Sequence, residues 1–330
     1  MCYNPGVSDL PDEFDIRNRK PRVIVAGGIN LDLAGHADGP APPGTSTPGK
    51  VTLSTGGVAR NIAENLAAMG CSVELVGAVG EDLLSRFVLE KTAAAGVGVD
   101  AVRRDSESTV GVYLSILAAG ELERAIADTG ATERINGATL RSMLVPFRDS
   151  RVSLLVLDTN LYPEALQTAL DWATEEEVPV LVEPVSVEKS LRLAGLRGRI
   201  DYVTPNEAEI RALLGASAPL PEIRHWVVTR GDRGAGLYRP DPGSGGARSG
   251  DTDDLLDESR WELIIPAEIV TAVNVNGAGD AFVAAFSTGI VTGRSLEESL
   301  RLGVRAGTLT VQSSSTVAGT LTLENLIDLA

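Results

Sequence analysis

The chain has 330 residues, 43% of them hydrophobic, and a formal net charge of −16. A chain of this length can bury one large α/β core, while its acidity disfavours duplex nucleic acid, whose phosphates repel a negative surface. Two cysteines and two histidines give no basis for a disulfide framework or a zinc cluster.

The hydropathy of the chain also argues against membrane contact. No apolar run approaches the roughly 20 residues that span a bilayer. The first 20 residues carry four acidic side chains and lack the pattern of a signal peptide. We therefore expect a cytoplasmic protein that does not contact membranes.

Strand-like and helix-like segments alternate along the chain. Residues 1–20 have the composition of a flexible polar arm, and the apolar segment 21–28 predicts a buried first strand that ends in a glycine turn. Further strands are expected at 51–55, 73–79, 110–118, 123–128, 152–158 and 178–183, and helices at 81–95, 137–144 and 163–177. This order predicts an α/β fold with a doubly wound, mainly parallel sheet that carries helices on both faces.

Two β-rich pieces, at about 30–55 and 108–130, break the alternation. They predict a small β lid built as an excursion from the main sheet. The stretch 239–258 combines turn formers and acids without an apolar period, so a surface loop is expected there. Its composition fits a tolerated loop extension better than a regulatory insertion.

Residues 276–282, with the sequence NGAGDAF, form the most informative pattern. Gly277 and Gly279 would let the backbone approach an anion closely, and the first turn of the following helix would aim free N–H groups at it. Asp280 would then lie within reach of a substrate hydroxyl, which is the arrangement that phosphoryl transfer needs. The alternative is a plain helix start with Asp280 as a first-turn acid.

This segment resembles the phosphate-binding signature DTxGAGD of the ribokinase-like (PfkB) family of carbohydrate and nucleoside kinases, and here it occupies 274–280. The resemblance extends from about residue 22 to the C-terminus and implies one kinase domain over 21–330, with the β pieces as a lid over the sugar site. It makes Asp280 the catalytic base. The amides of Gly277, Ala278 and Gly279 would stabilise charge on the transferring phosphoryl group.

A second family signature, two glycines that lead into a helix with an asparagine, is matched by Gly56, Gly57 and Asn61. The resemblance implies that these three residues line the sugar pocket. Asp32, with Asn30 beside it, matches the family's sugar-binding acid and could accept hydrogen bonds from two vicinal hydroxyls. An Asx turn into the lid is the alternative for this pair. Arg60 and Asn65, on the same helix as Asn61, are expected to be solvated or packing residues.

The ATP side follows from two further segments. The family's NxxE signature falls on Asn206 and Glu209, one helical turn apart, which implies phosphate contact for the first residue and water-mediated magnesium binding for the second. A helix cap with a surface glutamate is the alternative. The strand and glycine turn at 227–236 match the strand before the adenine region, although alone they form an ordinary hairpin. The ATP-binding residues expected in total are Asn206, Thr229, Gly231, Gly234 and Asn276.

Within the family, the segments 56–70, 183–190 and 273–275 are similar to pseudouridine kinases more than to ribokinase or fructokinase. We therefore expect ATP-dependent phosphorylation of a primary ribose hydroxyl, with pseudouridine as the acceptor and a homodimer formed through the lid. A ribokinase, a fructokinase, another nucleoside kinase and a nucleoside-binding regulatory protein are the alternatives. Lid residues 127–129 differ from the Asp-Met pair expected. Asn274 replaces an acid that helps bind a monovalent cation, so a K⁺ requirement stays open.

Overall fold

The computed structural model describes residues 20–42, 44–118, 121–148, 150–240, 255–319 and 321–327. Two predicted features fall largely outside these ranges. They are the N-terminal arm, of which only residue 20 is described, and the surface loop, whose residues 241–254 are not described.

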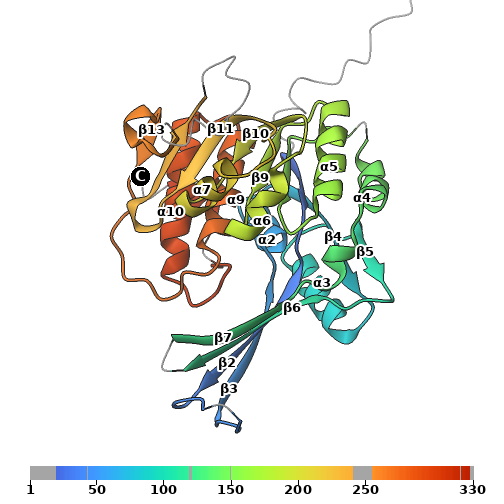
Figure 1. Ribbon diagram of the computed structural model, residues 1–330, viewed down its shortest axis with the longest axis vertical. Coiled ribbons are helices and arrows are strands. Elements are labelled where there is room, and N and C mark those ends of the chain that lie inside the picture. Colours follow the sequence, from blue (N-terminus) through green and yellow to red (C-terminus); the bar gives the residue numbers. More distant parts are fainter. Residues whose placement is uncertain are drawn as a thin grey trace, which may run out of the picture.

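A nine-stranded sheet forms the centre of the molecule (Figure 1). Its order is β13-β12-β11-β10-β9-β8-β1-β4-β5. Neighbouring strands from β11 to β5 are parallel, and the β11–β12 and β12–β13 pairs are antiparallel. The strands are β1 (Arg22–Ala26), β4 (Ser72–Gly80), β5 (Val102–Asp105), β8 (Leu154–Asp158), β9 (Val180–Glu183), β10 (Arg199–Val203), β11 (Glu222–Thr229), β12 (Ala235–Tyr238) and β13 (Leu263–Ile265). The predicted mainly parallel, doubly wound sheet is confirmed. The edge strand β5 was not predicted, because it is short and polar.

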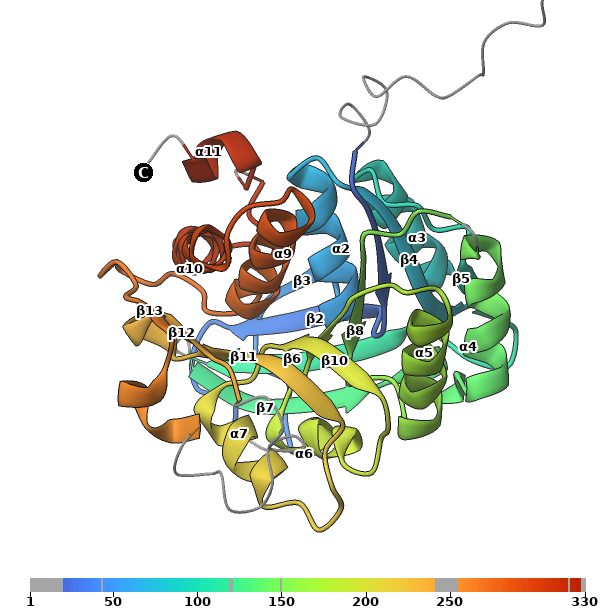
Figure 2. The same cartoon turned by 90° about the horizontal axis from the view of Figure 1, so that it is seen from above.

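Helices cover both faces of this sheet, as the view from above shows (Figure 2). The helices are α2 (Val58–Ala68), α3 (Leu83–Ala94), α4 (Gly137–Leu144), α5 (Pro163–Glu175), α6 (Val187–Ser190), α7 (Glu207–Leu214), α9 (Ala278–Val291), α10 (Leu296–Val311) and α11 (Leu323–Ile327). Side chains of α2, α3, α9 and α10 pack in one hydrophobic cluster, and those of α4, α5 and α7 pack in a second. Within the described residues, no helix combines the length and apolar character needed to cross a bilayer.

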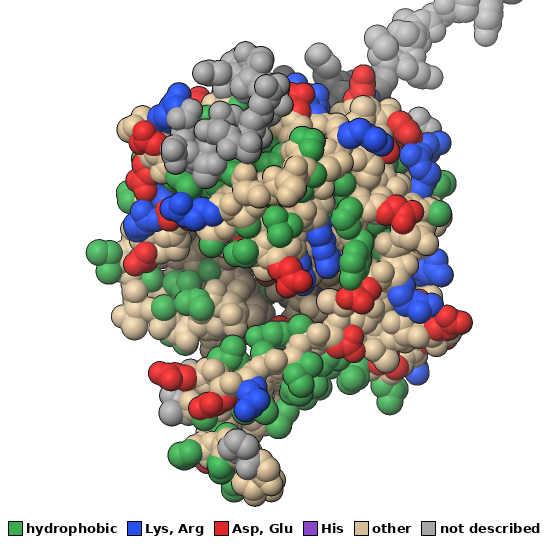
Figure 3. All heavy atoms as spheres, viewed as in Figure 1, with side chains coloured by type: hydrophobic (Ala, Val, Ile, Leu, Met, Phe, Trp, Pro, Cys, Tyr) green, Lys and Arg blue, Asp and Glu red, His purple; other side chains and the backbone are tan. Residues whose placement is uncertain are grey.

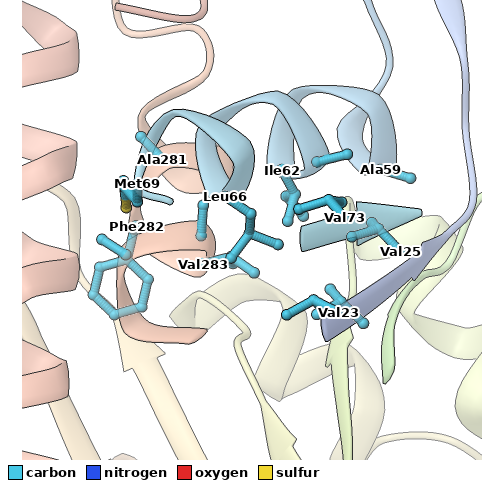
Figure 4. Close-up of a cluster of buried hydrophobic side chains, with 14 of the residues drawn as sticks. Val23, Val25, Ala59, Ile62, Leu66, Met69, Val73, Ala281, Phe282 and Val283 are labelled. Atoms are coloured by element: carbon cyan, nitrogen blue, oxygen red, sulfur yellow. The ribbon is translucent and has the colours of Figure 1, made fainter. Parts of the chain in front are cut away.

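The central strand β1 shows how the two clusters arise. Val23 and Val25 point into the cluster of α2 and α9, close to Ile62 (Figure 4), whereas Ile24 and Ala26 point into the other cluster. These four side chains are fully buried, and only Arg22 at the start of β1 is partly exposed. Successive side chains of a strand alternate between faces, so a strand covered on both faces must be apolar throughout. Each buried Val or Ile contributes about 1.5–3 kcal/mol to stability relative to exposure.

A second sheet projects from the main body (Figure 1). Its four strands, in the order β3-β2-β6-β7, come from the two β-rich pieces that interrupt the alternation. They are β2 (Asn30–Ala37), β3 (Gly49–Gly56), β6 (Gly111–Ala118) and β7 (Glu121–Asp128). β7 is exposed along its whole length, so this edge of the sheet is uncovered.

Candidate active site

The candidate site lies where parallel strands of the main sheet end. Asp158 and Glu183 are the last residues of β8 and β9, Thr204 follows β10, and Thr229 ends β11. Ligands of doubly wound sheets bind outside these carboxyl ends, because polar groups from several strands converge there.

Asp158 organises the glycine turn that follows β1. Its buried carboxylate accepts hydrogen bonds from the backbone N–H groups of Gly28 (3.0 Å), Ala59 (2.8 Å) and Asn160 (2.8 Å). A Cβ on Gly27 would collide with the same carboxylate, which explains the glycine there. Asp158 thereby joins the end of β1 to the first turn of α2. This residue was not predicted from the sequence, although an acid at the end of a buried strand was a usable signal.

The predicted sugar-binding residues meet at the base of the second sheet. Asn30 and Asp32 lie on β2, two positions apart, so their side chains share one face of the sheet. A Cβ on Gly56 would overlap the Asp32 carboxylate, and Gly57 has φ of +97° and lies against the backbone of the first glycine turn. The two glycines therefore let the turn into α2 pack closely against β2. Burial raises the pKa of Asp32 to about 6, opposed by the positive charge of Arg60. Sugar contact by these residues remains a prediction.

The predicted base, Asp280, lies in the first turn of α9. The helix starts after Gly277, which adopts the left-handed conformation with φ of +81° and has no room for a Cβ, because one would collide with the carbonyl oxygen of Thr316. The Asp280 carboxylate accepts a hydrogen bond at its Oδ2 from Nδ2 of Asn61 (2.8 Å). Both residues were predicted to lie at the site, and they are in direct contact although 219 positions separate them in the chain.

The electrostatic surroundings of Asp280 suit a proton acceptor. Burial raises its pKa to about 7; the hydrogen bond from Asn61 and the charge of Arg60 oppose this rise, and the negative charges of Asp158 and Asp32 add to it. A carboxylate whose pKa lies near the working pH can accept a hydroxyl proton and later release it.

Gly279 differs from the other glycines of the site. It has no positive φ, and apart from its chain neighbours and the backbone of its own helix no described atom lies within 4 Å of the position that its Cβ would take. Neither backbone geometry nor packing against the described residues requires a glycine here. The missing side chain leaves open space beside the first turn of α9, where N–H groups have no helical partners.

A cavity of about 640 Å³ opens next to this turn. Of the predicted nucleotide-binding and catalytic residues, it is lined by Thr229, Gly231, Gly234, Ala278 and Gly279. The remaining wall includes apolar side chains such as Phe282, Val304 and Val311. The other predicted residues, Asn206, Asn276, Gly277 and Asp280, do not line the cavity. The cavity thus joins the glycine turn after β11 to the start of α9.

Asn206 and Glu209 form a capping box at the start of α7. The Asn206 Oδ1 accepts from the Glu209 backbone N–H (3.0 Å), and the Asn206 N–H donates to Glu209 Oε2 (2.9 Å). The helix cap considered in the sequence analysis is therefore present, but Glu209 is only 4% exposed instead of lying on the surface. Burial raises its pKa. In the described part of the chain, no group of three His, Cys, Asp or Glu side chains could hold a metal ion.

The loop before α9 is held by amide side chains. Asn276 donates its backbone N–H to Oδ1 of Asn274 (3.0 Å), and the Asn274 amide nitrogen donates to the carbonyl oxygen of Ser314 (3.3 Å). An aspartate at 274 could not make the second bond, because a carboxylate has no donor.

A strained turn follows β9. Val185 has φ of +66°, which is unfavourable for a β-branched residue, and the Ser186 N–H donates to the Pro184 carbonyl oxygen (2.7 Å) across it. The Glu183 carboxylate holds this turn by accepting from the Val185 N–H (3.1 Å) and from Thr204 Oγ1 (2.6 Å), and burial raises its pKa to about 8. The segment 183–190 was singled out from its sequence, but the strain was not predictable from residue types. Strained backbone is often kept at functional sites.

Comparisons with known proteins show the family to which the chain belongs. Residues 20–323 match the pfkB family of carbohydrate kinases. Over 322 residues the chain is 30% identical to a pseudouridine kinase of Escherichia coli, covering 94% of this chain and 96% of that protein. The fold is similar to a carbohydrate kinase from Agrobacterium tumefaciens (TM-score 0.77, 26% identity, 93% and 95% of the two chains). It is also similar to Arabidopsis thaliana ribokinase complexed with ribose and ATP (TM-score 0.71, 21% identity, 94% and 99%).

The family match and the relatives that cover nearly the whole chain define a phosphotransferase with an alcohol group as acceptor. The chain belongs to the pfkB family of carbohydrate kinases and is a sugar or nucleoside kinase within it.

Proposed function

We propose that the protein transfers the γ-phosphoryl group of ATP to the primary 5′-hydroxyl of pseudouridine. The observation that carries the proposal is the contact between Asp280 and Asn61 beside the open face of Gly279, next to the 640 Å³ cavity. This arrangement supports the proposal, because the proposed base, the start of α9 and a cavity large enough for a nucleotide are adjacent.

In this proposal Asp280 takes the proton of the attacking hydroxyl. Its Oδ2 accepts from Asn61, so Oδ1 is the oxygen that faces the acceptor. The amides of Gly277, Ala278 and Gly279 lie at the helix start, where they stabilise negative charge on the phosphoryl group in transit. Asp32 and Asn30 hold the ribose hydroxyls from β2, and Gly56, Gly57 and Asn61 shape the pocket.

ATP would occupy the cavity beside α9. Thr229, Gly231 and Gly234 bring backbone close to the nucleotide, and the apolar wall with Val304 suits an adenine ring. Asn206 and Asn276, which do not line the cavity, would reach phosphate oxygens nearby.

Glu209 is the residue that would hold magnesium, through water, beside the phosphates of ATP. One Glu209 oxygen is committed to the capping box, so a contact through water suits this residue, in line with the preference of Mg²⁺ for water ligands. Bound there, the ion would offset the negative charge of the phosphates.

The choice of pseudouridine rests on the 30% identity to the bacterial pseudouridine kinase over nearly the whole chain and on the segments 56–70 and 183–190. Pseudouridine carries one ring N–H more than uridine. A site that pairs this donor can discriminate between the two nucleosides, whereas a site that contacts only the sugar cannot.

The test is a turnover assay with ATP in which pseudouridine, uridine, ribose and fructose compete at equal concentration. We expect the highest kcat/KM for pseudouridine. Equal use of ribose or fructose would contradict the nucleoside assignment and favour a sugar kinase. Binding of a nucleoside in calorimetry without turnover of any acceptor would favour a regulatory binding protein.

We also propose that the second sheet acts as a lid and joins two copies of the chain. Its register places Leu53 of β3, Leu33 of β2, Leu114 of β6 and Ile126 of β7 in one row. Leu53, Leu114 and Ile126 are 51%, 38% and 67% exposed, and hydrophobic side chains are visible along the projecting sheet (Figure 3). Such a row is costly to leave in water and suits the same face of a second copy. Light scattering would detect the dimer, and Ile126→Glu should dissociate it.

A further inference from the structure

Arg60 is a buried charge that the proposed reaction does not yet use. It lies on α2 and is only 3% exposed, so it is not solvated, and of the two roles expected from sequence only packing is compatible with this burial. Its guanidinium donates from Nη1 to Asn61 Oδ1 (2.9 Å) and to the carbonyl oxygen of Thr55 (3.1 Å), from Nε to Thr92 Oγ1 (3.4 Å), and it forms an ion pair with Glu64. These contacts from three sides restrict the orientation of the planar guanidinium.

The contact with Asn61 decides which way that amide faces. Because Oδ1 of Asn61 accepts from Arg60, its Nδ2 faces Asp280 and donates to the carboxylate (2.8 Å). The flipped amide would set its NH₂ group against the guanidinium and its oxygen against the carboxylate, and both contacts would be repulsive. Arg60 thereby selects the orientation in which Asn61 holds one oxygen of the base.

We propose that Arg60 is a positioning residue for the catalytic base, acting on Asp280 through the amide of Asn61 and by its charge. The inference rests on the proposed role of Asp280. A chain of contacts runs from the Glu64 carboxylate through Arg60 and Asn61, all on α2, to Asp280 on α9. These contacts keep the base oriented and ionised before the acceptor binds.

The charges around Asp280 show why a cation is needed there. The negative charges of Asp158 at the end of β8 and of Asp32 on β2 raise the pKa of Asp280, and the positive charge of Arg60 lowers it. The charge of Asp280 in turn raises the pKa of Glu183 at the end of β9. Arg60 itself stays protonated at neutral pH, since burial lowers its pKa only to about 10, with Asp32 and Asp280 opposing the shift. Without Arg60, Asp280 would keep its proton to higher pH. Less of it would then be the ionised carboxylate that accepts the hydroxyl proton near neutral pH.

Arg60→Gln and Arg60→Lys test the proposal, with Arg134→Gln as the control. Arg134 forms ion pairs with Asp105 and Glu107 and is half-exposed, so its loss removes charge pairs without touching the site. In Arg60→Gln, the acidic limb of the pH profile of kcat/KM should move by about one unit to higher pH, which is about a tenfold loss at pH 6 and much less at pH 9. Arg60→Lys, which keeps the charge, should move the limb less. The control should match the parent at every pH.

A second measurement separates this proposal from the assignment of the reaction. The Asp280 carboxyl can be titrated by ¹³C NMR of aspartate-labelled protein without substrates, with Asp280→Asn to assign the signal. Arg60→Gln should raise the Asp280 midpoint, and the increase should shrink in an Asn61→Ala background.

Three outcomes would count against the proposal or its basis. An equal loss of activity at all pH values with an unchanged Asp280 titration would make Arg60 merely structural and overturn the inference. If Arg60→Gln raised the Asp280 midpoint by the same amount in the Asn61→Ala background, Arg60 would not act on Asp280 through the Asn61 amide. Full activity of Asp280→Asn would instead overturn the assignment of the base, while the titration would still report whether Arg60 acts on the carboxyl group.

Discussion

Replacing Asp280 by Asn should separate catalysis from folding at this site. Asn can accept the hydrogen bond from Asn61 through its own Oδ1, so the local geometry survives. It cannot take a proton from the acceptor hydroxyl. Loss of a positioned base typically lowers kcat by about 10²–10⁴-fold, which corresponds to about 3–5 kcal/mol of transition-state stabilisation.

The same change should stabilise the fold at neutral pH. Burial raises the pKa of Asp280 to about 7, so its ionised form is disfavoured in the folded state by burial and by the charges of Asp158 and Asp32. For an acid with a raised pKa, this penalty is absent below the unfolded value near 3.8, grows as pH rises, and levels off above about 7. The melting temperature of Asp280→Asn should therefore exceed that of the parent by a margin that widens between pH 4 and pH 7.

The assay combines steady-state turnover, calorimetric binding of ATP and thermal melting at several pH values. Asp171→Asn, a change on the exposed face of α5, is the matched control and should leave all three unchanged. A kcat within a few-fold of the parent would refute the role of Asp280 as base. A melting difference that does not change with pH would refute the raised pKa of its carboxyl group.

Three further predictions concern neighbouring residues. Asp32→Ala should weaken sugar binding by about 1–3 kcal/mol, because it leaves substrate hydroxyls unpaired, and should spare ATP affinity; equal weakening of both ligands in calorimetry would mean a structural role. Gly277→Ala should lower the melting temperature, because the backbone at this position is left-handed and crowded. Gly279→Ala should melt like the parent but turn over poorly with ATP. Parent-like turnover of Gly279→Ala would argue against phosphate binding beside Gly279. Replacing K⁺ by Na⁺ should barely change the parent rate, and Asn274→Asp, which frees a loop carbonyl oxygen, should create K⁺ stimulation; strong K⁺ dependence of the parent would contradict this account.

Local patterns in the sequence were sufficient for most of the fold. The apolar run of β1 and the alternation of strands and helices predicted the parallel sheet, because burial on both faces demands a continuous apolar strand. The glycines at 277 and 279 and the acid at 280 predicted the start of α9, because these residue types favour a helix start and a close backbone approach. The pair Asn206 and Glu209 likewise matched a capping motif that operates within one helical turn.

Only the tertiary structure decided which residues of the site contact one another. Asn61 and Asp280 are 219 positions apart and Asp158 lies 130 positions from Gly28, so their contacts depend on strand order and helix packing. The same packing buries Arg60, turns the Asn61 amide toward the base and raises the pKa of Asp280 to about 7. Residue types near one another in the chain determine which elements form, because backbone and side-chain preferences act over a few residues. The burial of a side chain and the charges near it depend on segments that meet only in the folded chain. A single sequence therefore does not reveal either of them.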